Sequence, residues 1–172
     1  EGMKAAKVLT TAKHFPGLGA VTGNTDISAG VRDDQTNSNS ESVQIFKDLI
    51  SSGTPSIMTA TAIYDKIDPN LPGAFSSKMV DGLLRKQLGF DGLVITDDLS
   101  NAVQVQSWTP GQRAVLALSA GNDLVLANEP TQIPEMISEV LQKVKADPDF
   151  AKKISQSATR VIKVKEEMKL VE

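Results

Sequence analysis

Two adjacent carboxylates near the middle of the chain have the residue type and the position to do chemistry. Asp97 and Asp98 follow the short apolar run "GLVIT" (92–96), which is typical of a buried strand. Active sites of parallel α/β folds form at the carboxyl ends of the strands. A carboxylate there could serve as a nucleophile or as an acid or base, or it could only cap the next segment.

A lysine and the only histidine of the chain end an earlier apolar run. Lys13 and His14 stand in "AKHFPG" (12–17), directly before a proline-glycine turn. A lone histidine there is often only a hydrogen-bonded turn residue, and the lysine could simply face solvent. If both runs are strands of one parallel sheet, the two side chains share an edge with Asp97 and could bind hydroxyl groups of a ligand. The glycine-rich loop that follows, 18–26, ends in one carboxylate, Asp26.

The composition excludes several other kinds of site. The 172 residues carry a net charge of −3, so nothing indicates a nucleic-acid partner or an anionic membrane surface. The absence of cysteine excludes disulfides, thiolate zinc sites and a cysteine nucleophile, and a single histidine excludes a histidine-rich metal site. We therefore expect neither a metal nor a cofactor. The apolar runs are far shorter than the roughly 20 residues of a membrane-spanning helix.

The elements that would position these side chains alternate along the chain. Short apolar runs bounded by Gly, Pro or Asp predict buried strands over Lys7–Phe15, Ser56–Ala60, Gly92–Thr96 and Asp123–Ala127. Apolar residues at helical spacing predict helices over Glu41–Ser51, Ser77–Gly89, Gln112–Ala120, Gln132–Lys145 and Asp149–Val171. Residues 33–40 and 64–77 are expected to be irregular connections. Strands that alternate with helices predict right-handed crossovers and a parallel sheet, and therefore an α/β fold.

Three stretches of the chain resemble a known family. "AKHFPGLG", "IMTATAIYDKIDPNLPGAFSSKMVDGLLRKQLGFDGLVITDDL" and "AVLALSAGNDLVL" occur in this order and span nearly the whole chain. They resemble the catalytic domain of glycoside hydrolase family 3, above all its bacterial β-N-acetylglucosaminidases. The resemblance implies a (β/α)8 TIM barrel. It also implies a small carbohydrate substrate and release of terminal β-linked N-acetylhexosamine from cell-wall or chitin-derived amino sugars.

The resemblance assigns roles to three of the candidate residues. The aspartate of the "GFDGLVITD" motif, here Asp97, corresponds to the nucleophile that forms a covalent glycosyl-enzyme, so that the anomeric configuration is retained. The lysine and histidine of "KHFPG", here Lys13 and His14, correspond to residues that hydrogen-bond sugar hydroxyls. His14 is therefore expected to bind substrate and not to carry the catalytic proton.

The loop after "KHFPG" departs from the family pattern. In the N-acetylglucosaminidase branch this loop ends Asp-Ser-His, and its histidine is the general acid/base, whereas here it ends Asn24-Thr25-Asp26. Three possibilities follow: Asp26 is the acid/base, the role lies outside this chain, or catalysis is impaired. A carboxyl group can do this work if apolar surroundings or a nearby carboxylate raises its pKa.

The number of strands is a second departure, because a TIM barrel has eight and the sequence predicts four. Residues 1–172 are therefore expected to be the C-terminal half of the barrel, with the absent N-terminal half as their partner. Half a barrel leaves two unpaired strand edges and half a core. We expect such a chain to be unstable as an isolated monomer.

Two other functions stay open at this point. A family member without the usual histidine could bind sugar without turning it over. A β-glucosidase-like specificity is the other, although β-glucosidases typically carry Asp-Trp where this chain has Asp97-Asp98.

Overall fold

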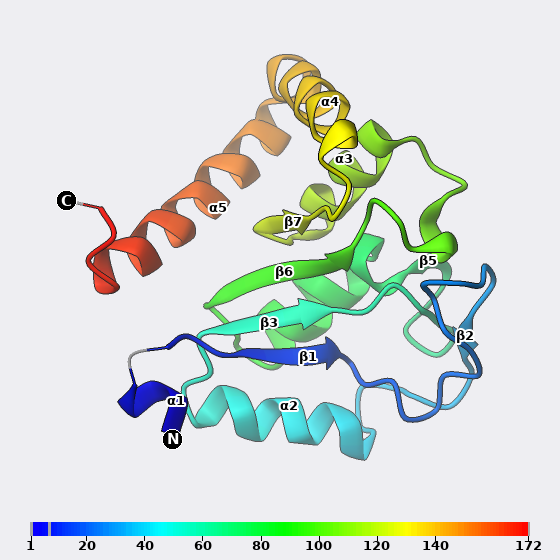
Figure 1. Cartoon of the computed structure of the whole chain (residues 1–172). Helices are drawn as coiled ribbons and strands as arrows, with labels where there is room; N and C mark the ends of the chain where they lie inside the picture. The colour runs from blue at the N-terminus through cyan, green and yellow to red at the C-terminus, as the bar shows by residue number, and fades with distance from the viewer. Residues whose placement is uncertain (1, 7, 172) are drawn as a thin grey trace.

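The computed structural model describes residues 2–6 and 8–171, and a four-stranded sheet lies at its centre (Figure 1). The strands are β1 (Thr11–Phe15), β3 (Ser56–Thr59), β6 (Leu93–Asp98) and β7 (Leu124–Leu126), adjacent in that order. All three pairings are parallel, so the predicted α/β fold is confirmed. Within the described residues β1 and β7 each pair on one side, and the barrel is not closed.

Helices make the crossovers that parallel strands require. Helix α2 (Glu41–Ser51) lies between β1 and β3, the π-helix η2 (Lys78–Gln87) between β3 and β6, and α3 (Pro110–Ala120) between β6 and β7. Helix α1 (Gly2–Ala5) precedes β1, and α4 (Ile133–Ala146) and α5 (Pro148–Glu167) follow β7. Three short 3₁₀ segments are η1 (Gly73–Phe75), η3 (Val103–Val105) and η4 (Pro130–Gln132). In Figure 1, α2 lies below the sheet and α4 and α5 lie above it.

Local sequence signals set the ends of several of these helices. Helix α3 begins with a capping box, in which the Thr109 and Gln112 side chains each bond the other residue's backbone N–H. It ends at Gly121, whose φ of +112° suits a residue without a Cβ. Helix α5 begins at Asp147, whose carboxylate accepts two backbone N–H groups of the first turn. The bounds of all five predicted helices agree with the observed bounds within a few residues, and those of α2 agree at both ends.

Two features of the strands differ from the prediction. The first strand begins at Thr11 and not at Lys7, which lies outside the described residues. Strand β6 continues past Thr96 to Asp98, so Asp97 lies within the strand. Its side chain is therefore held by the sheet and not by a mobile loop.

A second, small sheet was missed, because it lies mostly in segments predicted to be irregular. It consists of β2 (Arg32–Asp33), β4 (Ile63–Tyr64) and β5 (Asp68–Pro72), with β2 and β4 parallel and β4 and β5 antiparallel. Two-residue strands carry no readable alternation of apolar and polar residues. Long-range contacts hold them instead, including the bond from Arg32 Nε to Asp65 Oδ1 at 2.9 Å.

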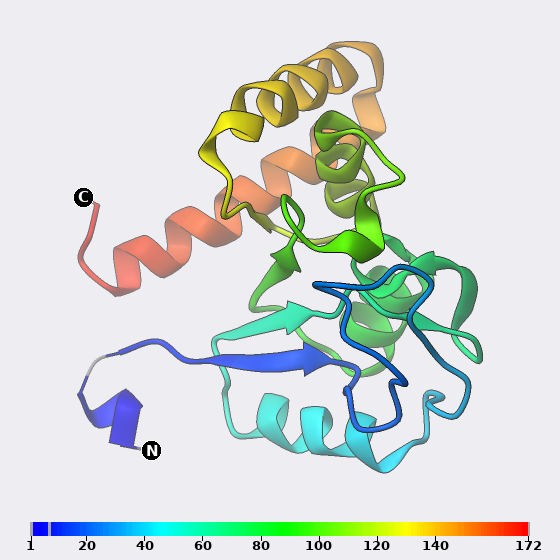
Figure 2. The same cartoon turned by 45° about the vertical axis from the view of Figure 1, so that its right-hand side comes forward.

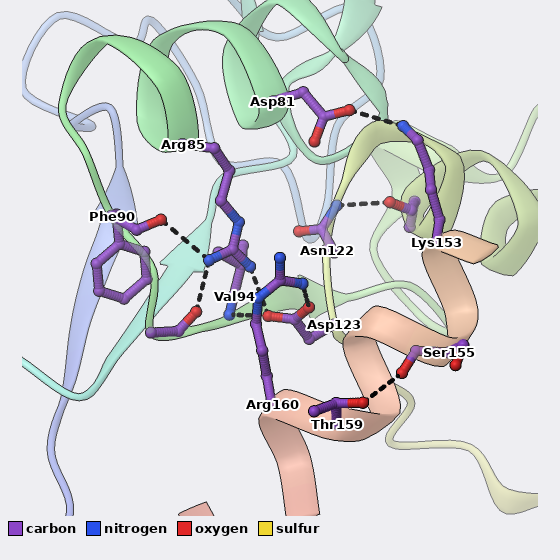
Figure 3. A network of polar contacts seen from close by, with 12 residues as sticks. Asp81, Arg85, Phe90, Val94, Asn122, Asp123, Lys153, Ser155, Thr159 and Arg160 are labelled. Carbon is purple, nitrogen blue, oxygen red and sulfur yellow. Dashed lines mark hydrogen bonds and ion pairs between the residues drawn. The ribbon is translucent and has the colours of Figure 1, made fainter. Parts of the chain in front are cut away.

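A polar network holds α5 against the amino-terminal ends of β6 and β7 (Figure 3). The Asp123 side chain is fully buried and accepts hydrogen bonds from Arg85 at 2.6 Å, from Arg160 at 2.9 Å and from the backbone N–H of Val94 at 2.9 Å. A more exposed pair, Lys153 and Asp81, lies beside it at 2.6 Å. The network lies at the end of the strands opposite to that occupied by the candidate catalytic residues.

Candidate active site

The carboxyl ends of the strands surround a cavity of about 420 Å³. This volume lies within the usual range for small-molecule sites. Three of the four predicted site residues line it, namely Lys13 from β1, Asp97 from β6 and Asp26 from the loop after β1. The fourth, His14, is not among the lining residues but lies beside one of them, since its Nε2 is 3.5 Å from Asp97 Oδ2. The structure thus brings all four predicted residues to one edge of the sheet.

The "KHFPG" segment is tightly held around the end of β1. The Phe15 side chain is fully buried and packs edge-on against Phe46 of α2, with ring centroids 5.1 Å apart. The buried Tyr64 hydroxyl donates to the carbonyl of Gly17 at 2.8 Å, and burial raises the pKa of Tyr64 far above its usual value. The peptide bonds Lys13–His14 and Phe15–Pro16 are both cis. The packing of Phe15 and the hydrogen bond from Tyr64 hold the backbone from which the Lys13 and His14 side chains project.

Asp97 and Asp98 are neighbours with different surroundings. Asp98 is buried, and its carboxylate accepts hydrogen bonds from the Ser100 N–H and hydroxyl and from the Asn101 and Asn128 N–H groups. Burial by itself would raise the pKa of Asp98, but these hydrogen bonds together lower it below its usual value. Both aspartates line the cavity, but the Asp98 carboxylate is already taken up by the hydrogen bonds that close the turn after β6.

The surroundings of His14 favour its neutral form. Partial burial lowers its pKa below the ordinary value of 6.5, the Asp97 carboxylate opposes this shift by raising the pKa, and Lys13 lowers it further. The Asp26 carboxylate also raises the pKa of His14, by less than Asp97 does. A neutral imidazole can donate to Asp97 or to a ligand without cancelling the negative charge of Asp97.

The loop that carries Asp26 lies along the segment after β6. In Figures 1 and 2 the loop after β1, drawn in blue, runs beside the green segment that follows β6. The Asn24 side chain accepts the Asp26 N–H at 2.8 Å and shapes the turn. The Asp26 side chain is exposed, and it lines the cavity together with Asp97.

Two asparagines that the sequence reasoning missed also line the cavity. Asn101 follows β6 and Asn128 follows β7, and both have exposed side chains. Asn128 could have been found, because it comes directly after the predicted strand Asp123–Ala127, at the same edge as Asp97. Asn101 lies three positions beyond Asp98, and no pattern indicated which way its side chain turns.

Metal ligands and membrane spans give no further candidates. The described residues contain no group of three or more His, Cys, Asp or Glu side chains that could hold a metal ion. No helix in residues 2–6 and 8–171 is long and apolar enough to cross a bilayer.

Comparison with known proteins gives one consistent answer. Residues 1–164 match the model of the glycosyl hydrolase family 3 N terminal domain. A β-hexosaminidase of Methylobacillus flagellatus is 35% identical over 148 residues, which are 85% of this chain and 42% of that protein. A β-hexosaminidase of Hydrogenovibrio crunogenus is 36% identical over 143 residues, or 81% of this chain and 40% of that protein. The chain therefore spans less than half the length of these relatives.

Solved structures agree with the sequence relatives. A β-N-acetylhexosaminidase from Beutenbergia cavernae has a TM-score of 0.94 and 51% identity, covering 96% of this chain and 49% of that one. A family 3 β-N-acetylglucosaminidase from a Paenibacillus species has a TM-score of 0.90 and 27% identity, covering 97% of this chain and 32% of that one. The family inferred from the motifs is thereby confirmed.

Proposed function

The chain belongs to glycoside hydrolase family 3, and from this membership we propose that it supplies the catalytic residues of a retaining, exo-acting β-N-acetylhexosaminidase. The substrate class is a terminal β-linked N-acetylhexosamine, such as those of cell-wall or chitin-derived sugars. The names of the relatives support this class. The observation that carries the proposal is the shared cavity of Asp97, Asp26 and Lys13 at the carboxyl ends of parallel strands.

In the first step, Asp97 acts as the nucleophile. Its carboxylate attacks the anomeric carbon as the glycosidic bond breaks, and the departing oxygen takes a proton from Asp26. The sugar is then bound to Asp97 as an ester. The strand position of Asp97 favours this role, because a nucleophile must be held within a few tenths of an ångström of its line of attack.

In the second step, Asp26 acts as the base. It accepts a proton from a water molecule, whose oxygen attacks the anomeric carbon and releases Asp97. Two inversions at one carbon give overall retention. Lys13 and the neutral His14 bind sugar hydroxyls during both steps, and His14 also stays close enough to Asp97 to orient its carboxylate.

We also propose that these four strands are half of an eight-stranded barrel that residues outside this chain complete. The open edges at β1 and β7 support this, since a closed barrel leaves no strand edge unpaired. The complete polypeptide is therefore the right material for every activity measurement.

Trapping the glycosyl-enzyme tests the proposed function. The complete polypeptide is incubated with a 5-fluoro N-acetylglucosaminyl fluoride, which forms the ester quickly and hydrolyses it slowly. Mass spectrometry of peptides should place the label on Asp97. Asp97→Ala should take no label and should lose turnover by several powers of ten, or roughly 5 kcal/mol of barrier or more. A label on Asp98 instead would move the nucleophile and overturn the assignment.

A sugar-binding protein without turnover is the second candidate, and one observation favours it. Within residues 2–6 and 8–171 the Asp26 carboxylate has no hydrogen-bonded or ion-paired side chain to orient it, whereas acid/base groups are commonly oriented by a neighbour. In that case the complete polypeptide would bind N-acetylglucosamine in calorimetry but would neither take the label nor hydrolyse an aryl glycoside.

A further inference from the structure

The loop that carries Asp26 is joined by hydrogen bonds to the 3₁₀ segment η3, which follows the Asp97 strand. The backbone N–H of Gln104 donates to the carbonyl of Thr25 at 3.0 Å, and that of Val103 donates to the carbonyl of Asp26 at 3.2 Å. These bonds join the loop that contains Asp26 directly to the segment that follows the strand of Asp97. Because they are backbone bonds, many residue types could make them.

The Gln104 side chain adds a contact that few residue types could make. Its Oε1 accepts the backbone N–H of Val31 at 2.9 Å, and its Nε2 donates to the carbonyl of the same residue at 3.1 Å. The Gln104 side chain thus pairs with Val31 as a neighbouring strand would. Both residues are buried, with 5% of each exposed, so water does not replace either bond.

The two bonds are not equally replaceable. The carbonyl of Val31 also accepts the N–H of Ile63 at 3.1 Å, so it keeps a partner without Gln104. The Val31 N–H has Gln104 Oε1 as its partner among the described residues. Removing the carboxamide would leave a buried N–H unpaired, which the loop could relieve only by moving toward water.

We propose that Gln104 is a positioning residue: by pairing with Val31 it fixes the loop 18–26 and the residues that join it to β2, so that Asp26 faces the cavity beside Asp97. This inference rests on the proposed function, since it takes Asp26 to be the acid/base. Gln104 does not line the cavity and would act only through the loop. The loop is then held in its working position before substrate binds.

Gln104→Met in the complete polypeptide tests the proposal, because methionine keeps the length of the side chain and removes both hydrogen bonds. We expect kcat for an N-acetylglucosamine disaccharide to fall about ten- to a hundredfold, the scale of a misplaced catalytic group, with little change in KM. An aryl glycoside with an activated leaving group should still form the glycosyl-enzyme at nearly the normal rate. Amide hydrogen exchange should accelerate in a peptide that contains Val31.

Gln106→Met is the matched control. Gln106 is the same residue type two positions on, but its side chain donates hydrogen bonds to the carbonyls of Ser100 and Ala102 and, among the described residues, makes none to the loop. Gln106→Met should leave the ratio of the rates on the two substrates unchanged. If Gln104→Met changes that ratio no more than Gln106→Met does, the positioning role is wrong.

The double variant Asp26→Ala/Gln104→Met distinguishes a failure of this inference from a failure of the proposed function. In the Asp26→Ala background, Gln104→Met should cause no further loss on the disaccharide, because its effect passes through Asp26. If Asp26→Ala alone keeps normal disaccharide hydrolysis, the acid/base assignment fails. If Asp26→Ala is impaired while Gln104→Met behaves as wild type, only the positioning role fails.

Gln104→Glu gives a second test should Gln104→Met fold poorly. An ionised carboxylate would face the Val31 carbonyl with no proton to donate, whereas a protonated carboxyl restores one donor and one acceptor. Relative to wild type at the same pH, its disaccharide activity should therefore recover as the pH falls. A ratio that stays constant or declines on acidification contradicts the hydrogen-bonded role of Gln104.

Discussion

Asp26 is the residue on which the chemistry depends most, because a carboxylate stands where the family resemblance implies a histidine. If Asp26 protonates the leaving group, Asp26→Ala should cripple the complete enzyme on a natural disaccharide. Glycosyl-enzyme formation from an activated aryl glycoside should be spared, because that leaving group needs little protonation. Azide should partly restore the second step, since an anionic nucleophile needs no base.

Steady-state kinetics on the two substrates, with and without azide, measure this. Asp34→Ala is a suitable control, because Asp34 is an exposed aspartate that does not line the cavity. An equal loss of activity on both substrates, without azide rescue, would mean that Asp26 only stabilises the turn and is not the acid/base.

The pKa of His14 depends on the negative charges of Asp97 and Asp26. Burial lowers the pKa of His14 and the Asp97 carboxylate raises it, with a smaller contribution in the same direction from Asp26. Removing a negative charge makes the imidazolium less favourable, so Asp97→Asn should lower the pKa of His14 further, and Asp26→Asn should lower it less. An NMR titration measures both, with the His14 signal assigned by its loss in His14→Gln. A rise in either variant would contradict the site geometry.

At the scale of elements, the buried Asp123 is one of the polar groups that attach α5 to the rest of the fold (Figure 3). Its side chain is fully buried and pairs with Arg85, of which 11% is exposed, and with Arg160. Removing one member of a buried ion pair leaves an uncompensated charge. Asp123→Asn should therefore lower the free energy of unfolding of the complete polypeptide by about 3–5 kcal/mol. Urea denaturation measures this difference.

Asp81→Asn is the matched control for that experiment. The Asp81–Lys153 pair belongs to the same surface but is about a third exposed, and pairs of that kind contribute roughly 0–1 kcal/mol. If the two variants lose similar free energies of unfolding, burial does not explain the contribution of Asp123 to stability. Activity on an aryl glycoside should survive in both, because the network lies away from the catalytic cavity.

For the whole molecule, the open sheet predicts how the isolated chain behaves. Strands β1 and β7 each have one unpaired edge among the described residues, and apolar side chains such as Ile137 and Leu141 of α4 are exposed. Unpaired edges and exposed apolar surface favour association over a monomeric fold. The 172-residue chain alone should unfold broadly or self-associate, whereas the complete polypeptide unfolds cooperatively. Calorimetry and sedimentation measure both, and a cooperatively folding monomer of the isolated chain would refute the half-barrel proposal.

Local sequence patterns are enough to predict the parallel sheet, its helices and the edge that holds the candidate site. Apolar runs and caps are local signals, and the rule that polar groups gather at strand ends brought Lys13, His14 and Asp97 together. The strand-end rule alone does not separate Asp97 from Asp98, and the family resemblance is what assigned the nucleophile to Asp97. The folded turn adds the physical difference, because the Asp98 carboxylate accepts hydrogen bonds from Ser100, Asn101 and Asn128.

The position of the Asp26 loop could not be predicted from local patterns. The contacts that place it join residues far apart in the chain, as Gln104 and Val31 do, and a two-residue strand such as β2 carries no periodic signal. Gln104 looks like any other polar residue in a sequence, and its burial and pairing exist only once η3 and the loop have come together. Local patterns fix elements, but side-chain pairing between distant segments is fixed by packing, because each partner satisfies the other only after water has been excluded.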